Sequence, residues 1–145
     1  MLQGIEQIFA DKDEMLKRLK KKNFEKNSEE FLRKFGHYFM EMSDYVTSAE
    51  NKEVAAKEIG QCIVDAVKET YTNKRGKIDS RTQIDLNFFM IYYVFPTILS
   101  TGENGKLIAD GVRDVWSNSF KDADIQYTDY NSLYNSFREK IFGIF

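Results

Sequence analysis

The stretch Asn87–Leu99, NFFMIYYVFPTIL, constrains the fold more than any other part of the chain, because it is the most apolar run and holds the only proline. A membrane-spanning helix needs about 20 consecutive apolar residues, but the uninterrupted run here extends only from Phe88 to Pro96. Charged residues lie just upstream of it, at Asp79, Arg81 and Asp85. A helix that is apolar all round and too short for a membrane belongs in a protein core. The stretch therefore predicts a central core helix over about 80–99.

The single proline affects the course of this predicted helix. Pro96 has no backbone N–H, and its ring clashes with the carbonyl of Tyr92, so the helix should kink or loosen there. The bend either fits the bundle or opens a ligand cavity at the freed carbonyl, and we favour the first interpretation because proline kinks need no function. Apolar residues around the proline recur at a spacing that directs one face to a single neighbour: Ile84, Phe88, Ile91, Phe95 and Ile98.

The rest of the chain also repeats apolar residues at helical spacing and shows no alternating strand pattern bounded by hairpin turns. Two of the helix starts have capping-box spacing, Asn27 with Glu30 and Ser80 with Gln83. Five further helices are predicted, covering Ile5 to about Leu19, Asn27 or Ser28 to Val46, Thr47 or Asn51 to Tyr71, Glu103 to Phe120, and Thr128 or Asp129 to Ile144. Short loops favour antiparallel neighbours. We therefore predict an all-α, single-domain compact bundle of about six helices over residues 1–145.

Composition fits this fold and narrows the classes of partner. The chain has the length of one ordinary domain, and its 14% aromatic content predicts an aromatic-rich core. The net charge of −2 predicts no attraction to nucleic acid or to an anionic membrane. The lysine-rich run between Lys17 and Lys26 is interpreted as a solvated helix end, because cations are favoured at a helix C-terminus.

The cysteine content and the first residues indicate a compartment. Cys62 is the only cysteine, which excludes an intrachain disulfide. The start, MLQGIEQIFADKDE, lacks the basic region and the long apolar region of a signal peptide. The many Lys, Asn, Ile, Tyr and Phe residues suggest an AT-rich coding genome. We therefore expect a cytoplasmic, bacterial protein.

Motifs that carry catalytic or metal chemistry are missing from the sequence. His37 is the only histidine, and with Glu41 it supplies two ligands at most, too few for a metal site. No nucleophile elbow, P-loop or dinucleotide glycine motif is present. Cys62 lies on an apolar helical stripe, where a free cysteine is usually a small hydrophobe. We predict no catalytic residue, no cofactor and no metal, and hence a protein that is not an enzyme.

Two tyrosines of the central stretch define a candidate ligand pocket. Buried phenols such as Tyr92 and Tyr93 need hydrogen-bond partners, and Asp85, Asn87 or His37 are candidates. A satisfied core network is the favoured interpretation, because most buried polar groups are simply paired. If these groups converge beside the Pro96 bend, they would instead orient a small ligand. The alternative function is therefore a small-molecule sensor or carrier.

The leading functional hypothesis is a non-enzymatic helical interaction domain of the adaptor, regulator or toxin-neutralising type. It rests on the lack of catalytic motifs in a compact, acidic bundle. The expected partner is an unidentified protein, contacted through exposed aromatic residues near Tyr127, Tyr130 and Tyr134. The chain is expected to be a monomer or a homodimer.

Overall fold

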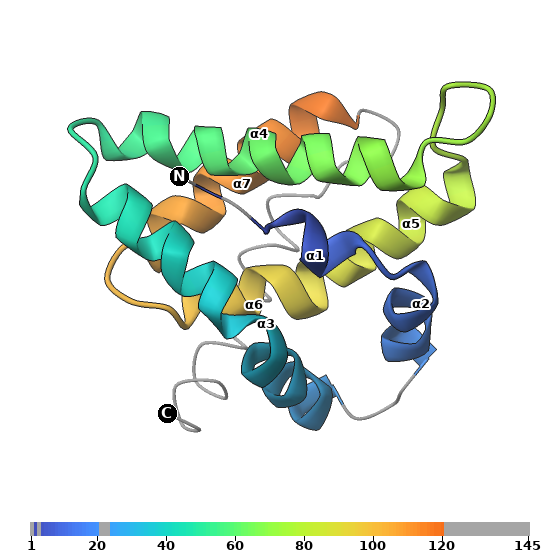
Figure 1. Ribbon diagram of the computed structural model, residues 1–145, viewed down its shortest axis with the longest axis horizontal. Coiled ribbons are helices and arrows are strands. Elements are labelled where there is room, and N and C mark those ends of the chain that lie inside the picture. The colour runs from blue at the N-terminus through green and yellow to red at the C-terminus, as the bar shows by residue number, and fades with distance from the viewer. Residues whose placement is uncertain (1, 3, 21–23, 121–145) are drawn as a thin grey trace.

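The computed structural model describes residues 2, 4–20 and 24–120 (Figure 1). Every regular element in this part of the chain is helical, which confirms the predicted all-α bundle. The elements are α1 (Glu6–Phe9), α2 (Lys12–Lys20), α3 (Phe24–Thr47), α4 (Lys52–Tyr71), α5 (Ser80–Phe89), the π-helical segment η1 (Met90–Val94), α6 (Phe95–Leu99) and α7 (Gly105–Ser119). The helix predicted from Thr128 or Asp129 to Ile144 lies outside the described residues.

The helices surround a central path formed by α5, η1 and α6, which is the helix predicted over about 80–99. In Figure 1, α4 and α7 lie together along one side of the molecule, α3 lies on the other, and α5, η1 and α6 run between them. The path contacts α2 through α5, α3 through η1 and α6, and α7 through α6. Every residue of α6 is buried. The apolar stretch is therefore a core helix.

The first predicted helix is divided in two, which the apolar spacing did not anticipate. Helix α1 ends at Phe9, and α2 begins at Lys12. Between them, the carboxylate of Asp11 accepts a hydrogen bond from the backbone N–H of Glu14 at 3.0 Å. An aspartate in this position satisfies a free N–H of the first helical turn and starts a new helix. The prediction of one continuous helix was wrong because this cap interrupts it.

Helix α3 begins at Phe24, so the predicted start at Asn27 or Ser28 was wrong. Both residues lie inside the helix and are buried, with exposed fractions of 3% and 7%. The hydroxyl of Ser28 is directed at the central path and does not cap α3. The polar pair therefore serves a contact between helices, which the capping-box spacing could not distinguish from a helix start.

Two other helix starts follow the short-range signals. The side chain of Asn51 accepts a hydrogen bond from the N–H of Val54 at 3.1 Å, and α4 begins at the next residue. Asp79 likewise accepts from the N–H of Thr82 at 2.9 Å at the start of α5, so the predicted capping box of Ser80 with Gln83 was wrong and the cap lies one residue earlier. Both oxygens occupy N–H groups that the first turn leaves without intrahelical partners. These caps fix where each helix begins.

The central path loosens into a π-helix directly before Pro96. The N–H of Phe95 donates to the carbonyl of Met90, five residues earlier, so this turn holds one residue more than an α-helical turn. The extra residue rotates everything after it by about 100° relative to a regular α-helix. Ile84 and Phe88 are therefore 47% and 46% exposed, while Phe95 is buried. The prediction that one face joins these residues was wrong because it assumed an unbroken α-helix.

An aromatic cluster fills the centre of the bundle, as the composition predicted. The ring of Phe31 on α3 lies 4.9 Å from that of Phe35 and 5.5 Å from that of Phe89. The ring of Tyr93 lies 5.7 Å from Phe31 and 5.6 Å from Phe89, centroid to centroid. Such tilted and edge-to-face pairs contribute about 0.5–1.5 kcal/mol each beyond the area they bury. The cluster locks α3 onto α5 and η1.

Candidate functional site

The two tyrosines predicted to line a pocket differ in their surroundings. Tyr93 is fully buried, and its hydroxyl donates to the backbone carbonyl of Arg18 at 2.8 Å. Burial raises the pKa of this phenol, and the positive charge of Arg18 opposes the rise. Tyr92 is half-buried, and its ring stacks on that of Phe88 at 5.9 Å with an interplanar angle of 11°. One tyrosine thus joins the core and the other continues to the surface.

The other three candidate pocket residues interact with different parts of the fold. The side-chain oxygen of Asn87 accepts from the indole N–H of Trp116 on α7 at 2.8 Å. Asp85 lies 3.9 Å from Arg81 on its own helix. His37 is exposed on α3, and its ring lies 3.8 Å from that of Tyr38. These contacts join the three polar side chains to three separate neighbours.

The carbonyl that Pro96 leaves without a backbone donor has a partner in α3. The hydroxyl of Ser28 donates to the carbonyl oxygen of Tyr92 at 3.3 Å. The hydroxyl of Thr97 donates in the same way to the carbonyl of Tyr93 at 2.7 Å. Side-chain hydroxyls thus satisfy two carbonyls in the loosened turn. This supports the interpretation of the Pro96 region as a bend that fits the bundle.

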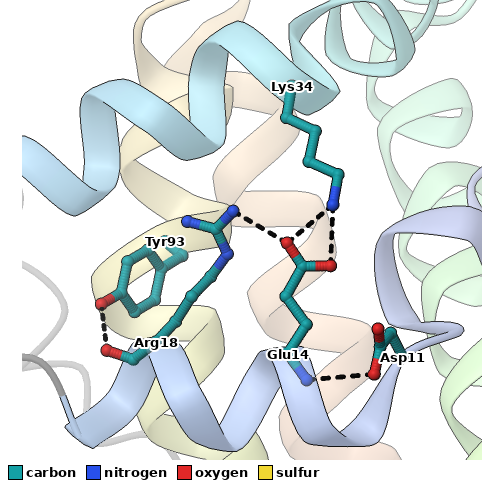
Figure 2. Close-up of polar contacts among 5 residues, drawn as sticks. All are labelled: Asp11, Glu14, Arg18, Lys34 and Tyr93. Atoms are coloured by element: carbon teal, nitrogen blue, oxygen red, sulfur yellow. Dashed lines mark hydrogen bonds and ion pairs between the residues drawn. The ribbon is translucent and has the colours of Figure 1, made fainter.

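A charged network ties α2 to α3 and η1 (Figure 2). Figure 2 shows the carboxylate of Glu14 between two cations, with Lys34 Nζ at 2.7 and 2.8 Å and Arg18 Nη2 at 3.0 Å. The hydrogen bond from Lys34 lowers the pKa of Glu14, and Arg18 adds to this effect against the opposing effect of burial. Sequence reasoning placed Arg18 in a solvated basic cluster. Its contacts here join residues that are far apart in the chain.

Arg18 is unusual for an arginine because only 8% of it is exposed. Its guanidinium lies 5.5 Å from the centre of the Phe31 ring, and Nε and Nη1 have no hydrogen-bond partner among the described residues. A depression of about 340 Å³ beside it is lined by three carboxylates and two cations: Asp11, Asp13, Glu14, Lys17 and Arg18. The ion pair between Glu14 and Arg18 within this lining favours a structural role here.

A larger groove lies where α4, α5 and α7 come together at their ends. Its volume is about 520 Å³, and ten described residues line it: Lys68, Thr72, Gly76, Lys77, Ile78, Ser80, Gln83, Ile84, Ser119 and Phe120. Two of these residues are cationic and none is acidic. Gln83 is 7% exposed, and its amide nitrogen has no hydrogen-bond partner among the described residues. The groove therefore presents hydrogen-bond donors and positive charge beside apolar side chains.

The loop between α4 and α5 forms one wall of this groove and is held by Asn73. The side-chain oxygen of Asn73 accepts from the N–H groups of Arg75 and Lys77 at 2.9 and 3.1 Å. Its backbone N–H donates to the carbonyl of Lys77 at 2.8 Å. Gly76 has φ +76°, a conformation that glycine adopts without strain. These bonds fix the backbone at Lys77, so this wall is formed in advance.

An exposed apolar strip runs from this groove along α5 into η1. It consists of Ile84, Phe88 and Tyr92, and we call it the aromatic strip. Among the described residues, Ile84 and Phe88 are the one pair of exposed large apolar side chains that lie one helical turn apart. The other exposed large apolar residues, Leu16, Met40 and Val54, are on three different helices. Single exposed apolar side chains are normal on a protein surface, whereas larger contiguous apolar patches mark interaction sites.

The sequence also predicted a tyrosine partner surface and no metal site. Tyr127, Tyr130 and Tyr134, the predicted partner surface, lie outside the described residues. Within residues 2, 4–20 and 24–120, no group of three or more His, Cys, Asp or Glu side chains is arranged to hold a metal ion. In the same part of the chain, no helix combines the length and the apolar character needed to cross a bilayer.

The described residues form an all-helical bundle with an aromatic core. A groove lined by both polar and apolar side chains lies at one end of it. No protein-family model matches the chain, and it matches no curated protein and no solved structure.

Proposed function

We propose that the protein is a non-enzymatic interaction domain that binds another protein through the aromatic strip on α5 and η1. The observation that carries this proposal is the exposure of Ile84 and Phe88, at 47% and 46%, next to the ring of Tyr92. Aromatic residues are enriched in the buried centres of protein interfaces. A partner that covers Ile84, Phe88 and Tyr92 would remove their exposed apolar surface from water, which favours binding.

The strip also has the rigidity that a binding surface needs. Leu86 and Phe89, on the opposite side of α5, are 0% and 2% exposed and hold the helix on the core. Asp79 caps its first turn, and the indole of Trp116 anchors Asn87 to α7. A side chain on a fixed helix loses little conformational freedom when a partner binds, which favours affinity. The surface is therefore preorganised.

A cytoplasmic, bacterial setting remains part of the proposal. Cys62 is half-buried beside the core, and burial raises the pKa of its thiol, with smaller contributions from the charges of Asp65 and Glu58. A thiol of this kind is mostly protonated and reacts slowly. A lone, unreactive cysteine suits a compartment in which thiols stay reduced.

Affinity purification from the native host tests the proposal. The wild type should recover a protein partner in stoichiometric amounts, and Phe88→Glu should lose it because a charge in the strip opposes apolar burial. Met40→Glu is the matched control, since Met40 is 50% exposed on α3, away from the strip. Loss of the partner in both variants, or in neither, would contradict the proposal.

Sedimentation of the purified protein distinguishes a foreign partner from self-association. We expect a monomer whose mass does not depend on Phe88. A dimer that Phe88→Glu converts to a monomer would show that the strip pairs two copies of this chain, and would overturn the proposal of a different protein partner.

A further inference from the structure

The groove at the ends of α4, α5 and α7 carries chemistry that protein binding through the strip does not use. Lys68 and Lys77 give its lining positive charge, and no lining residue among those described is acidic. Gln83 lines the same space, is buried to more than nine-tenths, and has an amide nitrogen without a hydrogen-bond partner among the described residues. Buried donors without an acceptor are rare in native proteins, and each one asks for an explanation. An anionic acceptor in the groove supplies one.

The apolar part of the lining suits a ligand with a hydrophobic body. Ile84 and Phe120 lie in the same groove as the lysines, and Lys68 Nζ is 5.8 Å from the centre of the Phe120 ring. Small-molecule sites typically have volumes of about 300–1,000 Å³ and combine apolar walls with a few placed polar groups. At about 520 Å³, this groove falls within that range.

Side chains, and not the start of α5, provide the positive character. The first turn of α5 is already capped, because the carboxylate of Asp79 accepts from both the N–H and the hydroxyl of Thr82, at 2.9 and 3.1 Å. The positive charge of the groove lining therefore comes from the ammonium groups of Lys68 and Lys77, and the amide of Gln83 adds a neutral donor. The loop held by Asn73 places Lys77 at the groove before any ligand arrives.

We propose that this groove binds a small organic carboxylate with an apolar body. The carboxylate accepts hydrogen bonds from Lys68, Lys77 and the amide of Gln83, and the apolar body packs against Ile84 and Phe120. Charge-assisted hydrogen bonds of this kind are stronger than neutral ones. The proposal does not depend on protein binding by the aromatic strip, and each is tested by its own measurement.

Titration with three probes of the same shape tests the ligand class. Phenylacetate, phenylacetamide and phenethylamine differ in charge and share an aromatic body. Trp116 is the only tryptophan of the chain, and its ring lies 4.6 Å from that of Phe120, so its fluorescence reports on the groove. Phenylacetate should bind at least about tenfold more tightly than either of the other two. Equal affinities, tighter binding of the amine, or no saturable response to phenylacetate would overturn the proposal.

Substitutions locate the site and separate it from general charge effects. Lys77→Met and Lys68→Met should each weaken phenylacetate binding by about tenfold. Lys74→Met removes an exposed lysine of the same loop that does not line the groove, and should leave binding unchanged. Gln83→Leu should weaken binding while the melting temperature stays the same or rises. Equal losses in Lys74→Met and Lys77→Met would show attraction by net charge alone and would overturn the site.

Discussion

The contact between α4 and α7 depends on a glycine at residue 111, and replacing it with alanine tests the packing directly. A Cβ atom at Gly111 would lie 2.7 Å from the Cβ of Ala56 and 2.9 Å from its backbone carbonyl carbon. Backbone atoms cannot rotate out of the way, so α4 and α7 would have to move apart. Gly60, one turn along α4, is also closely packed, although less tightly, since a Cβ there would lie 3.0 Å from the Cα of Val112.

The expected size of the effect follows from two opposing contributions. Alanine stabilises a helix interior by about 1 kcal/mol relative to glycine, whereas overpacking a core costs about 1–3 kcal/mol. Because the clash involves backbone, we take the upper part of that range and expect Gly111→Ala to lose about 1–2 kcal/mol of unfolding free energy. Gly36→Ala on α3 is the matched control, because the nearest contact of its Cβ would be Leu32 at an ordinary 3.5 Å. Gly36→Ala should therefore gain up to about 1 kcal/mol.

Urea unfolding followed by circular dichroism measures both variants. The midpoint of Gly111→Ala should fall and that of Gly36→Ala should rise, with the slope unchanged. If both variants gain stability equally, glycine at residue 111 is not needed for the approach of the helices. The description of α4–α7 packing would then be wrong.

Three further predictions concern titratable side chains. Glu14→Gln should lower the unfolding free energy by about 1–3 kcal/mol at neutral pH, because Arg18 and Lys34 lose their anionic partner. The pKa of Glu14 is lowered in the folded protein, so the stabilisation by its carboxylate should be lost as the pH falls below about 4.5. Unfolding midpoints should show this loss in the wild type and not in Glu14→Gln. Burial, with a smaller effect of the Asp11 carboxylate, raises the pKa of Tyr71 to about 12. The unfolding free energy should therefore fall above about pH 10, because the phenol ionises first in the unfolded chain. The fall should be smaller in Tyr71→Phe. Cys62 should react with a thiol reagent, followed by absorbance, more slowly in the folded protein than in urea, and equal rates would contradict its burial.

Short-range sequence signals were sufficient for the fold class and for two helix starts. The oxygens of Asn51 and Asp79 lie within three residues of the N–H groups that they cap, so sequence spacing alone can identify them. The same reasoning failed at Asn27 and Ser28, which have capping residue types but are buried in α3. Sequence spacing does not reveal whether a polar side chain caps its own helix or meets a different one.

The aromatic strip was missed because of one additional residue in a turn. Regular α-helical spacing put Ile84 and Phe88 on the same face as Phe95, and Pro96 indicated only that the helix would kink or loosen. How the helix loosens depends on partners elsewhere, such as Ser28 on α3, whose hydroxyl meets the carbonyl of Tyr92. A local pattern could not predict the π-helical turn or the rotation that follows from it.

The groove and the charged network depend on segments distant in the chain. Glu14 and Lys34 are separated by 20 residues, and their charges gave no signal of pairing. The groove combines the end of α4, the loop after it, the start of α5 and the end of α7. Gln83 was noted only for its capping spacing, while its burial depends on how these segments pack. Such sites need the tertiary arrangement.

The most direct test of protein binding through the aromatic strip is the dissociation constant of the recovered partner for wild type, Phe88→Ala and Met40→Ala. A central aromatic contact typically contributes at least about 2 kcal/mol, which corresponds to about a thirtyfold loss of affinity. We predict a loss of this size for Phe88→Ala and no change for Met40→Ala, with both variants folded as judged by circular dichroism. Unchanged affinity in Phe88→Ala would contradict the proposed binding surface.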